Sequence, residues 1–119
     1  MKLITGISSD YKQRSMLQLD DGTTVYLNLV YIEQQTGWFV DILWESKQIN
    51  GLRLTTSPNL LYKWKNVLPF GLMLLTNTNA EPLNLDDFST GTAQLYLLNQ
   101  DDMTEVDAFA YDPDYSSTG

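Results

Sequence analysis

The chain has 119 residues, enough for one domain with its own hydrophobic core, and it carries a formal net charge of −8. It contains neither cysteine nor histidine, which excludes disulfides, thiol chemistry, imidazole metal sites and histidine-dependent catalysis. The N-terminal apolar stretch is too short for a signal peptide, and no apolar run reaches membrane-spanning length, so we expect a soluble protein with no membrane partner.

Charge is distributed unevenly along the chain. All seven basic residues and six of the acidic residues fall within residues 1–65, whereas the other nine acids follow with no cation among them. Because phosphate binding needs clustered lysine or arginine, we expect no nucleic-acid partner. The acidic part is either an ordinary solubilising surface or a negative face that meets a basic partner or lines a passage that repels DNA.

The first predicted elements in chain order form β-hairpins. Two alternating apolar runs, MLQL and TVYLNLVY, flank Asp21-Gly22, a dipeptide that accepts the positive φ of a tight turn. IEQQTG then turns the chain into the strand WFVDILW, and ESKQ turns it into INGLRLTT, where Asn50-Gly51 predicts a bulge or a sharp bend. These runs predict a meander of antiparallel strands with apolar residues on both faces.

The second half predicts two more strands, GLMLLT and AQLYLL. Before them, SPNLLYKWKNVLPFG is bounded by Pro58 and Pro69, and its apolar spacing predicts a loop with a short helical turn. NTNAEPLN predicts a polar loop, and NLDDFSTGT a helical turn or loop. The periodicity is lost beyond Asn99, so we predict a β domain over residues 1–99 and an acidic C-terminal extension over residues 100–119.

The pattern predicts an all-β fold, either a small antiparallel β-barrel or a strongly curled sandwich, with one short helical segment. The predicted core residues lie in phase along one face of each strand: Val25, Leu27, Leu29, Trp38, Val40, Ile42, Trp44, Leu72, Leu74, Leu95 and Leu97. The second apolar face needs cover from the middle segment or from another protein. The predicted interface residues belong to that face or to the extension: Tyr26, Val30, Phe39, Leu43, Val106, Phe109 and Tyr111.

Candidate chemistry is sparse. Adjacent carboxylates at positions 20–21, 86–87 and 101–102 point apart in a strand or turn, so they do not supply the opposed pair of a glycosidase. No EF-hand spacing is present, and the glycines are scattered rather than gathered in a phosphate loop. We therefore expect no catalytic residue, no cofactor and no metal.

The abundant aromatic residues leave two binding functions open. One is a small β-sandwich module that binds glycans or peptides, with exposed rings as a stacking platform. The other concerns the acidic, aromatic C-terminal extension, which is either a frayed terminus or an arm that adds a strand to a partner's sheet edge.

The order of motifs carries a resemblance. DGTTVYLNLVY, GWFVDILW, GLRLTTSPNLL, PFGLMLLT, LDDF and AQLYLL follow one another between Leu17 and Leu98. This series resembles the baseplate plug family of tailed bacteriophages, known from cyanophage-type contractile tails. Trp38 and Asp41 fall on the family's W-x-x-D pattern, and Asp86-Asp87 on its Asp-pair turn. The chain departs from the family pattern at IEQQTG, which lacks a Trp-Asn, at LPFG, which has Phe for a second proline, and in the extension after Asn99.

The resemblance implies a structural viral protein rather than an enzyme. It implies a β-barrel-like subunit of the virion, made in the host cytoplasm and placed in the tail baseplate, where it closes or braces the lower end of the tube. The implied partners are hub, spike and tail-tube proteins and further copies of the chain, which would cover the second apolar face.

Overall fold

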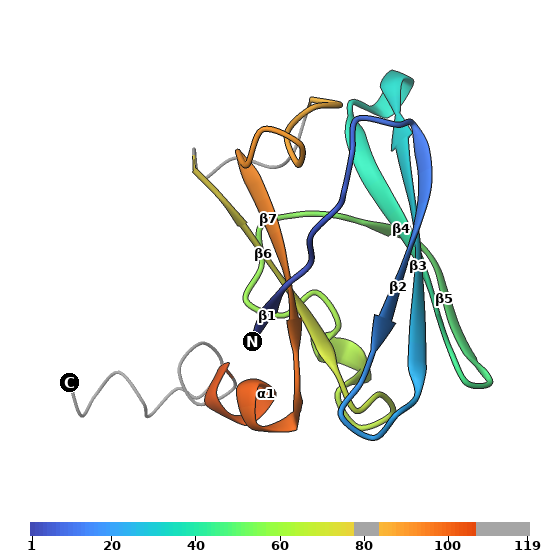
Figure 1. Ribbon diagram of the computed structural model, residues 1–119, viewed down its shortest axis with the longest axis vertical. Helices are drawn as coiled ribbons and strands as arrows, with labels where there is room; N and C mark the ends of the chain where they lie inside the picture. Colours follow the sequence, from blue (N-terminus) through green and yellow to red (C-terminus); the bar gives the residue numbers. More distant parts are fainter. Residues whose placement is uncertain (78–83, 107–119) are drawn as a thin grey trace.

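The computed structural model describes residues 1–77 and 84–106. Within them, two antiparallel sheets lie face to face as a sandwich (Figure 1). The elements in chain order are β1 (Lys2–Leu3), β2 (Lys12–Gln18), β3 (Thr24–Ile32), the 3-10 helix η1 (Glu33–Gln35), β4 (Gly37–Trp44), β5 (Lys47–Arg53), the 3-10 helix η2 (Tyr62–Trp64), β6 (Gly71–Thr76), β7 (Ala93–Leu98) and α1 (Gln100–Val106). The all-β prediction is confirmed in its sandwich form, because the described strands form two separate sheets rather than a closed barrel.

One sheet has the strand order β2-β3-β4-β5, the meander that the sequence predicts. Its first hairpin turns through residues 19–23, where Gly22 takes a φ of +89° and the Leu19 amide donates to the Thr23 carbonyl oxygen over 2.8 Å. At the last hairpin the register shifts between Val40 and Ile42, opposite Gly51, whose φ is +70°. The bulge expected at Asn50-Gly51 is therefore confirmed.

The other sheet has the order β1-β7-β6. β1 is short and was not evident from the sequence; it pairs with β7 through Lys2 opposite Leu97 and Leu3 opposite Tyr96. The middle segment covers the free edge of β6, because Ser57 bridges Leu74 and the Leu60 amide donates to the Leu72 carbonyl oxygen over 2.7 Å. This segment also contains the short helical turn that its apolar spacing predicts.

The core lies between the two sheets. Alternation along β3 and β4 places Val25, Leu27, Leu29, Trp38, Val40 and Ile42 inward, all at most 1% exposed. From the other sheet come Leu72, Leu74 and Leu95, fully buried, and Leu97, 8% exposed. Trp44 differs from its neighbours: it packs against this cluster but stays partly exposed, with its Nε1 donating to Thr23 Oγ1 over 2.9 Å.

The middle segment belongs to this core as well. Leu54, Leu61, Leu68 and Phe70 are at most 2% exposed and complete the cluster between the sheets. Since the segment fills the interior and the β6 edge, it does not cover the other face of β2–β5. The expectation that another protein covers that face stays a prediction.

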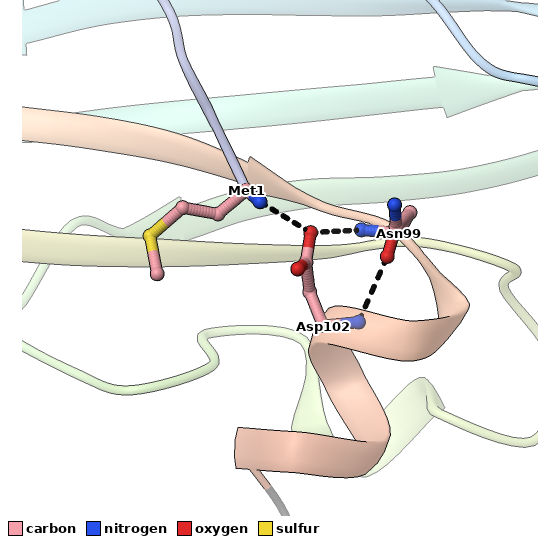
Figure 2. A network of polar contacts seen from close by, with 3 residues as sticks. All are labelled: Met1, Asn99 and Asp102. Atoms are coloured by element: carbon pink, nitrogen blue, oxygen red, sulfur yellow. Dashed lines mark hydrogen bonds and ion pairs between the residues drawn. The ribbon is translucent and has the colours of Figure 1, made fainter.

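The helix α1 was not expected, because residues after Asn99 lack strand periodicity. It begins with a reciprocal cap: the Asp102 amide donates to Asn99 Oδ1 over 2.8 Å, and the Asn99 amide donates to Asp102 Oδ2 over 3.1 Å (Figure 2). The same Oδ2 lies 2.7 Å from the Met1 ammonium nitrogen (Figure 2). Met103 is 5% exposed, and α1 packs against β7. The expected domain boundary between residues 99 and 100 stays a prediction.

Candidate interaction surface

The outer face of the β2–β5 sheet, which points away from the other sheet, collects apolar side chains. Pairing aligns Met16, Tyr26 and Leu43 across β2, β3 and β4 in one row. A second row pairs Val30 with Phe39, and Ile32 follows two residues along β3. Each is at least partly exposed, and Met16 is 67% exposed. We call this set the outer patch: Met16, Tyr26, Val30, Ile32, Phe39 and Leu43.

Three cations lie among the residues of the outer patch. Lys12 pairs with Val30, and Arg53 pairs with Phe39, so a cation lies at each end of the second apolar row. The Arg14 guanidinium carbon lies 5.1 Å from the centre of the Tyr26 ring, and that of Arg53 lies 5.3 Å from the Phe39 ring centre. The face is therefore locally cationic on a chain whose formal net charge is −8.

The polar row between the two apolar rows holds the sheet in shape. Arg14 Nε donates to Asn28 Oδ1 over 2.7 Å, and Asn28 pairs with Asp41 on β4. Asp41 Oδ1 accepts the Gly51 amide over 2.7 Å and so holds the bulged strand β5. This carboxylate, which falls on the W-x-x-D pattern, therefore has a structural partner in β5.

Behind the outer patch, an edge-to-face series of aromatic rings runs into the core. Ring centres are 6.0 Å apart for Tyr11 and Tyr31, 5.4 Å for Tyr31 and Trp38, and 5.5 Å for Trp38 and Phe88. Trp38 Nε1 donates to the Asn84 carbonyl oxygen over 3.2 Å. Trp38 is fully buried, so it cannot serve as a stacking platform for a glycan.

One carboxylate of each adjacent pair serves local structure. Asp21 Oδ1 accepts the Thr23 hydroxyl over 2.6 Å and the Thr23 amide over 2.9 Å, and these hydrogen bonds lower the pKa of Asp21. Asp87 is 7% exposed and accepts the Asn84 amide over 3.0 Å. Asp102 caps α1. Within the described ranges no three histidine, cysteine, aspartate or glutamate residues are grouped so as to hold a metal ion.

An open cleft of about 450 Å³ lies between the start of the chain, the first hairpin turn and the start of α1. Its lining includes four carboxylates: Asp20, Asp21, Asp101 and Asp102. Asp21 already accepts a hydrogen bond from Thr23, and Asp102 already contacts the Met1 ammonium and the Asn99 amide. The cleft therefore offers a loose group of acids rather than a formed ligand site.

The predicted interface residues fall into two groups. Tyr26, Val30, Phe39 and Leu43 come together on the outer patch, whereas Val106 lies half-buried at the end of α1, beside the other sheet. Phe109 and Tyr111 lie outside the described residues. Sequence reasoning missed Met16 and the three cations. Alternation along β2, out of phase with Leu17, was the signal that could have placed Met16, Lys12 and Arg14, whereas Arg53 comes from β5.

Comparisons with known proteins identify the family of the chain. No curated protein matches the chain. Among the described residues, no helix has the length and apolar character needed to cross a membrane. A family model described as cyanophage baseplate Pam3 plug gp18 matches residues 1–101, which include every described strand and the first two residues of α1. Such a family indicates a structural role among other components of the phage tail baseplate in the virion, and the chain belongs to this cyanophage baseplate plug family.

Proposed function

We propose that the chain closes or braces the hub end of the phage tail tube, and that it does so by docking its outer patch on a neighbouring baseplate protein. The observation that carries this proposal is the outer patch itself. Six apolar side chains lie on a sheet face that the described chain leaves partly exposed. The sequence contains no cysteine and no histidine, so it offers neither a thiol nor an imidazole for catalysis.

The composition of the outer patch supports docking. Aromatic residues, methionine and arginine are enriched in protein interfaces, and the patch with its cations contains Tyr26, Phe39, Met16, Arg14 and Arg53. Fully burying one such apolar side chain contributes about 1.5–3 kcal/mol, so several together can supply the energy of a stable contact. The two apolar rows lie on either side of one polar row on the same sheet face, which lets one partner surface cover them at once.

The patch is also rigid. Each outward residue on β3 and β4 alternates with a buried one, so Tyr26 and Val30 are flanked by Val25, Leu27 and Leu29, none of which is exposed. A surface fixed in this way loses little conformational freedom when it binds. A rigid docking surface suits a structural component of an assembled tail.

Cryo-electron microscopy of virions of the source phage tests the proposal. We expect density for this chain at the hub end of the tube, with the β2–β5 sheet turned toward a neighbouring subunit. A reconstruction with the chain elsewhere in the virion, or with the outer patch facing open solvent, would contradict it.

A further inference from the structure

We propose that the outer patch receives residues 107–119 of a second copy of the same chain. This deepens the proposed function and takes its setting from it, because it names one occupant of the docking face. It concerns a part of the chain beyond the family match, which ends at residue 101.

The composition of residues 107–119 complements the outer patch. The segment DAFAYDPDYSSTG contains the aromatic residues Phe109, Tyr111 and Tyr115, three aspartates and no cation. The outer patch is bordered by the cations Lys12, Arg14 and Arg53. The polar row between its two apolar rows contains one acid, Asp41. Attraction between this cationic face and an acidic segment gives orientation as well as affinity.

The spacing of the aromatic residues also fits. In an extended segment, Phe109 and Tyr111 would lie on the same side about 7 Å apart. Successive outward residues along β3, such as Tyr26, Asn28 and Val30, are separated by the same distance. The two apolar rows are four residues apart along β3, at Tyr26 and Val30, and Tyr111 and Tyr115 have the same separation in the segment. Two aromatic side chains of an extended segment could therefore contact the two rows, and the aspartates between them could reach the cations.

The position of α1 favours a second copy over the same molecule. α1 packs against β7, in the sheet opposite to the outer patch (Figure 1). Phe109 follows Val106 by three residues and so lies within about 11 Å of it, because an extended chain spans at most about 3.6 Å per residue. The two layers of a sandwich are themselves about 10 Å apart, and outward side chains widen the path around them. A tether of three residues is therefore too short to pass both layers, which favours a second copy for the contact made by Phe109.

This contact joins two different surfaces, so it is heterologous. Each copy presents the outer patch on one sheet and α1, after which residues 107–119 follow in the chain, against the other sheet. A series of such contacts closes into a ring or continues as a filament. A closed ring is the arrangement expected around a tube, and it would cover every outer patch with no further protein.

Sedimentation velocity on the purified full chain tests the inference with two variants. The first, Lys12→Glu with Arg14→Glu, reverses two exposed cations of the outer patch, and the second, Phe109→Ser with Tyr111→Ser, removes two aromatic side chains of the segment. We expect the wild-type chain to self-associate and each variant to raise the dissociation constant about tenfold or more. The matched control, Lys47→Glu with Lys63→Glu, makes the same charge change at exposed positions outside the outer patch and should associate like the wild type.

Mixing the two variants gives the decisive result. One variant keeps an intact segment and the other an intact outer patch, so a single heterologous contact can form and the mixture should yield dimers but nothing larger. Thermal unfolding of each variant alone checks that the fold is kept. A wild-type chain that stays monomeric, a variant that associates as well as the wild type, or a mixture that forms no dimer would overturn the inference.

These outcomes are separate from the fate of the proposed function. The solution experiment needs no other phage protein, whereas placement at the hub end is read from the virion. A chain that occupies the baseplate but stays monomeric in solution would retain the proposed function and remove the second copy as occupant. Self-association in solution with no density at the hub end would retain the second copy as occupant and remove the proposed function.

Discussion

Trp38 lies at the centre of the aromatic series that joins β4 to the turn before β7. Its ring contacts Tyr31 and Phe88 edge to face, and it is fully buried. The sequence indicated this position from phase alone, because Trp38 alternates with Val40 and Ile42 on one face of WFVDILW. The hydrogen bond to Asn84 could not be foreseen, since it joins residues 46 positions apart.

We expect Trp38→Ala to lower the free energy of unfolding by about 3–5 kcal/mol, because it removes a buried aromatic side chain and leaves a cavity. Urea unfolding followed by circular dichroism measures this change. Trp64→Ala is the control and should cost less, since Trp64 is only partly buried. An unchanged midpoint for Trp38→Ala would show that this ring does not support the core.

A second residue-scale prediction concerns Gly71. A Cβ at this position would lie 2.6 Å from Asn59 Oδ1. That oxygen accepts the Leu61 amide over 3.0 Å and the Leu72 amide over 3.2 Å, and Asn59 is 3% exposed. We therefore expect Gly71→Ala to displace Asn59, leave buried amides unpaired and cost about 1–3 kcal/mol of unfolding free energy.

Urea unfolding of a double-mutant cycle separates this cause from a general loss of strand stability. With Asn59→Ala already present, the added Cβ meets no amide, so Gly71→Ala should cost clearly less than it does in the wild-type background. Equal costs in both backgrounds would argue that the contact with Asn59 is not the reason for the glycine.

Among the elements, α1 shows most clearly what periodicity misses. Its seven residues, QDDMTEV, carry one buried apolar side chain, Met103, and too few turns for an amphipathic pattern to stand out. The readable signal was local: Asn99 and Asp102 have the spacing of a reciprocal N-terminal cap. β1 was missed for a different reason, because two residues are too few to alternate and its pairing with β7 is long-range.

The cap of α1 should depend on pH. Burial of Asp102 raises its pKa, but the hydrogen bonds from the Met1 ammonium and the Asn99 amide, with the charge of that ammonium, outweigh the burial, so the pKa lies below the ordinary value of 3.8. A carboxyl whose folded-state pKa is lowered stabilises the fold above its unfolded-state pKa. That contribution is lost as the pH falls through the folded-state pKa.

We therefore expect carbon-detected nuclear magnetic resonance titration to place the pKa of Asp102 below 3.8. We also expect α1 to lose protection from amide hydrogen exchange as the pH falls through the folded-state pKa of Asp102. Acetylating the α-amino group of Met1 should move the pKa of Asp102 back upward, because it removes the ammonium. A pKa at or above the ordinary value in the unmodified chain would contradict the role of this network.

At the scale of the whole molecule, burial and exposure divide the described residues into a core that specifies the sandwich and an outer face with partly exposed apolar side chains. The charge division along the sequence becomes spatial in the folded chain. Three cations gather on the outer patch, while the acids of α1 lie beside the opposite sheet. Such a molecule has two unlike sides, which is a suitable property for a subunit that repeats around an axis.

We expect Met16→Glu to leave folding unchanged and to reduce incorporation into the baseplate. Met16 is 67% exposed, so its replacement should change the free energy of unfolding by no more than about 0.5 kcal/mol. The introduced carboxylate would have to be desolvated when the outer patch is covered, which weakens docking. Quantitative mass spectrometry of purified virions measures the copies incorporated.

Leu75→Glu is the matched control for this experiment. Leu75 is 43% exposed and lies on β6 of the other sheet, so the same change in polarity is made away from the outer patch. Normal incorporation of Leu75→Glu together with loss of Met16→Glu supports docking through the outer patch. Normal incorporation of both variants would count against it.

The sequence alone determined the all-β class, the order of the main strands, the bulge at Gly51 and the membership of Trp38 in an apolar face, because turns and alternation are written in neighbouring residues. Tertiary structure decided the rest. It separated the strands into two sheets, drew the middle segment into the core and left one apolar face with cations among its residues. Those outcomes depend on contacts between residues far apart in the chain, which no local pattern specifies.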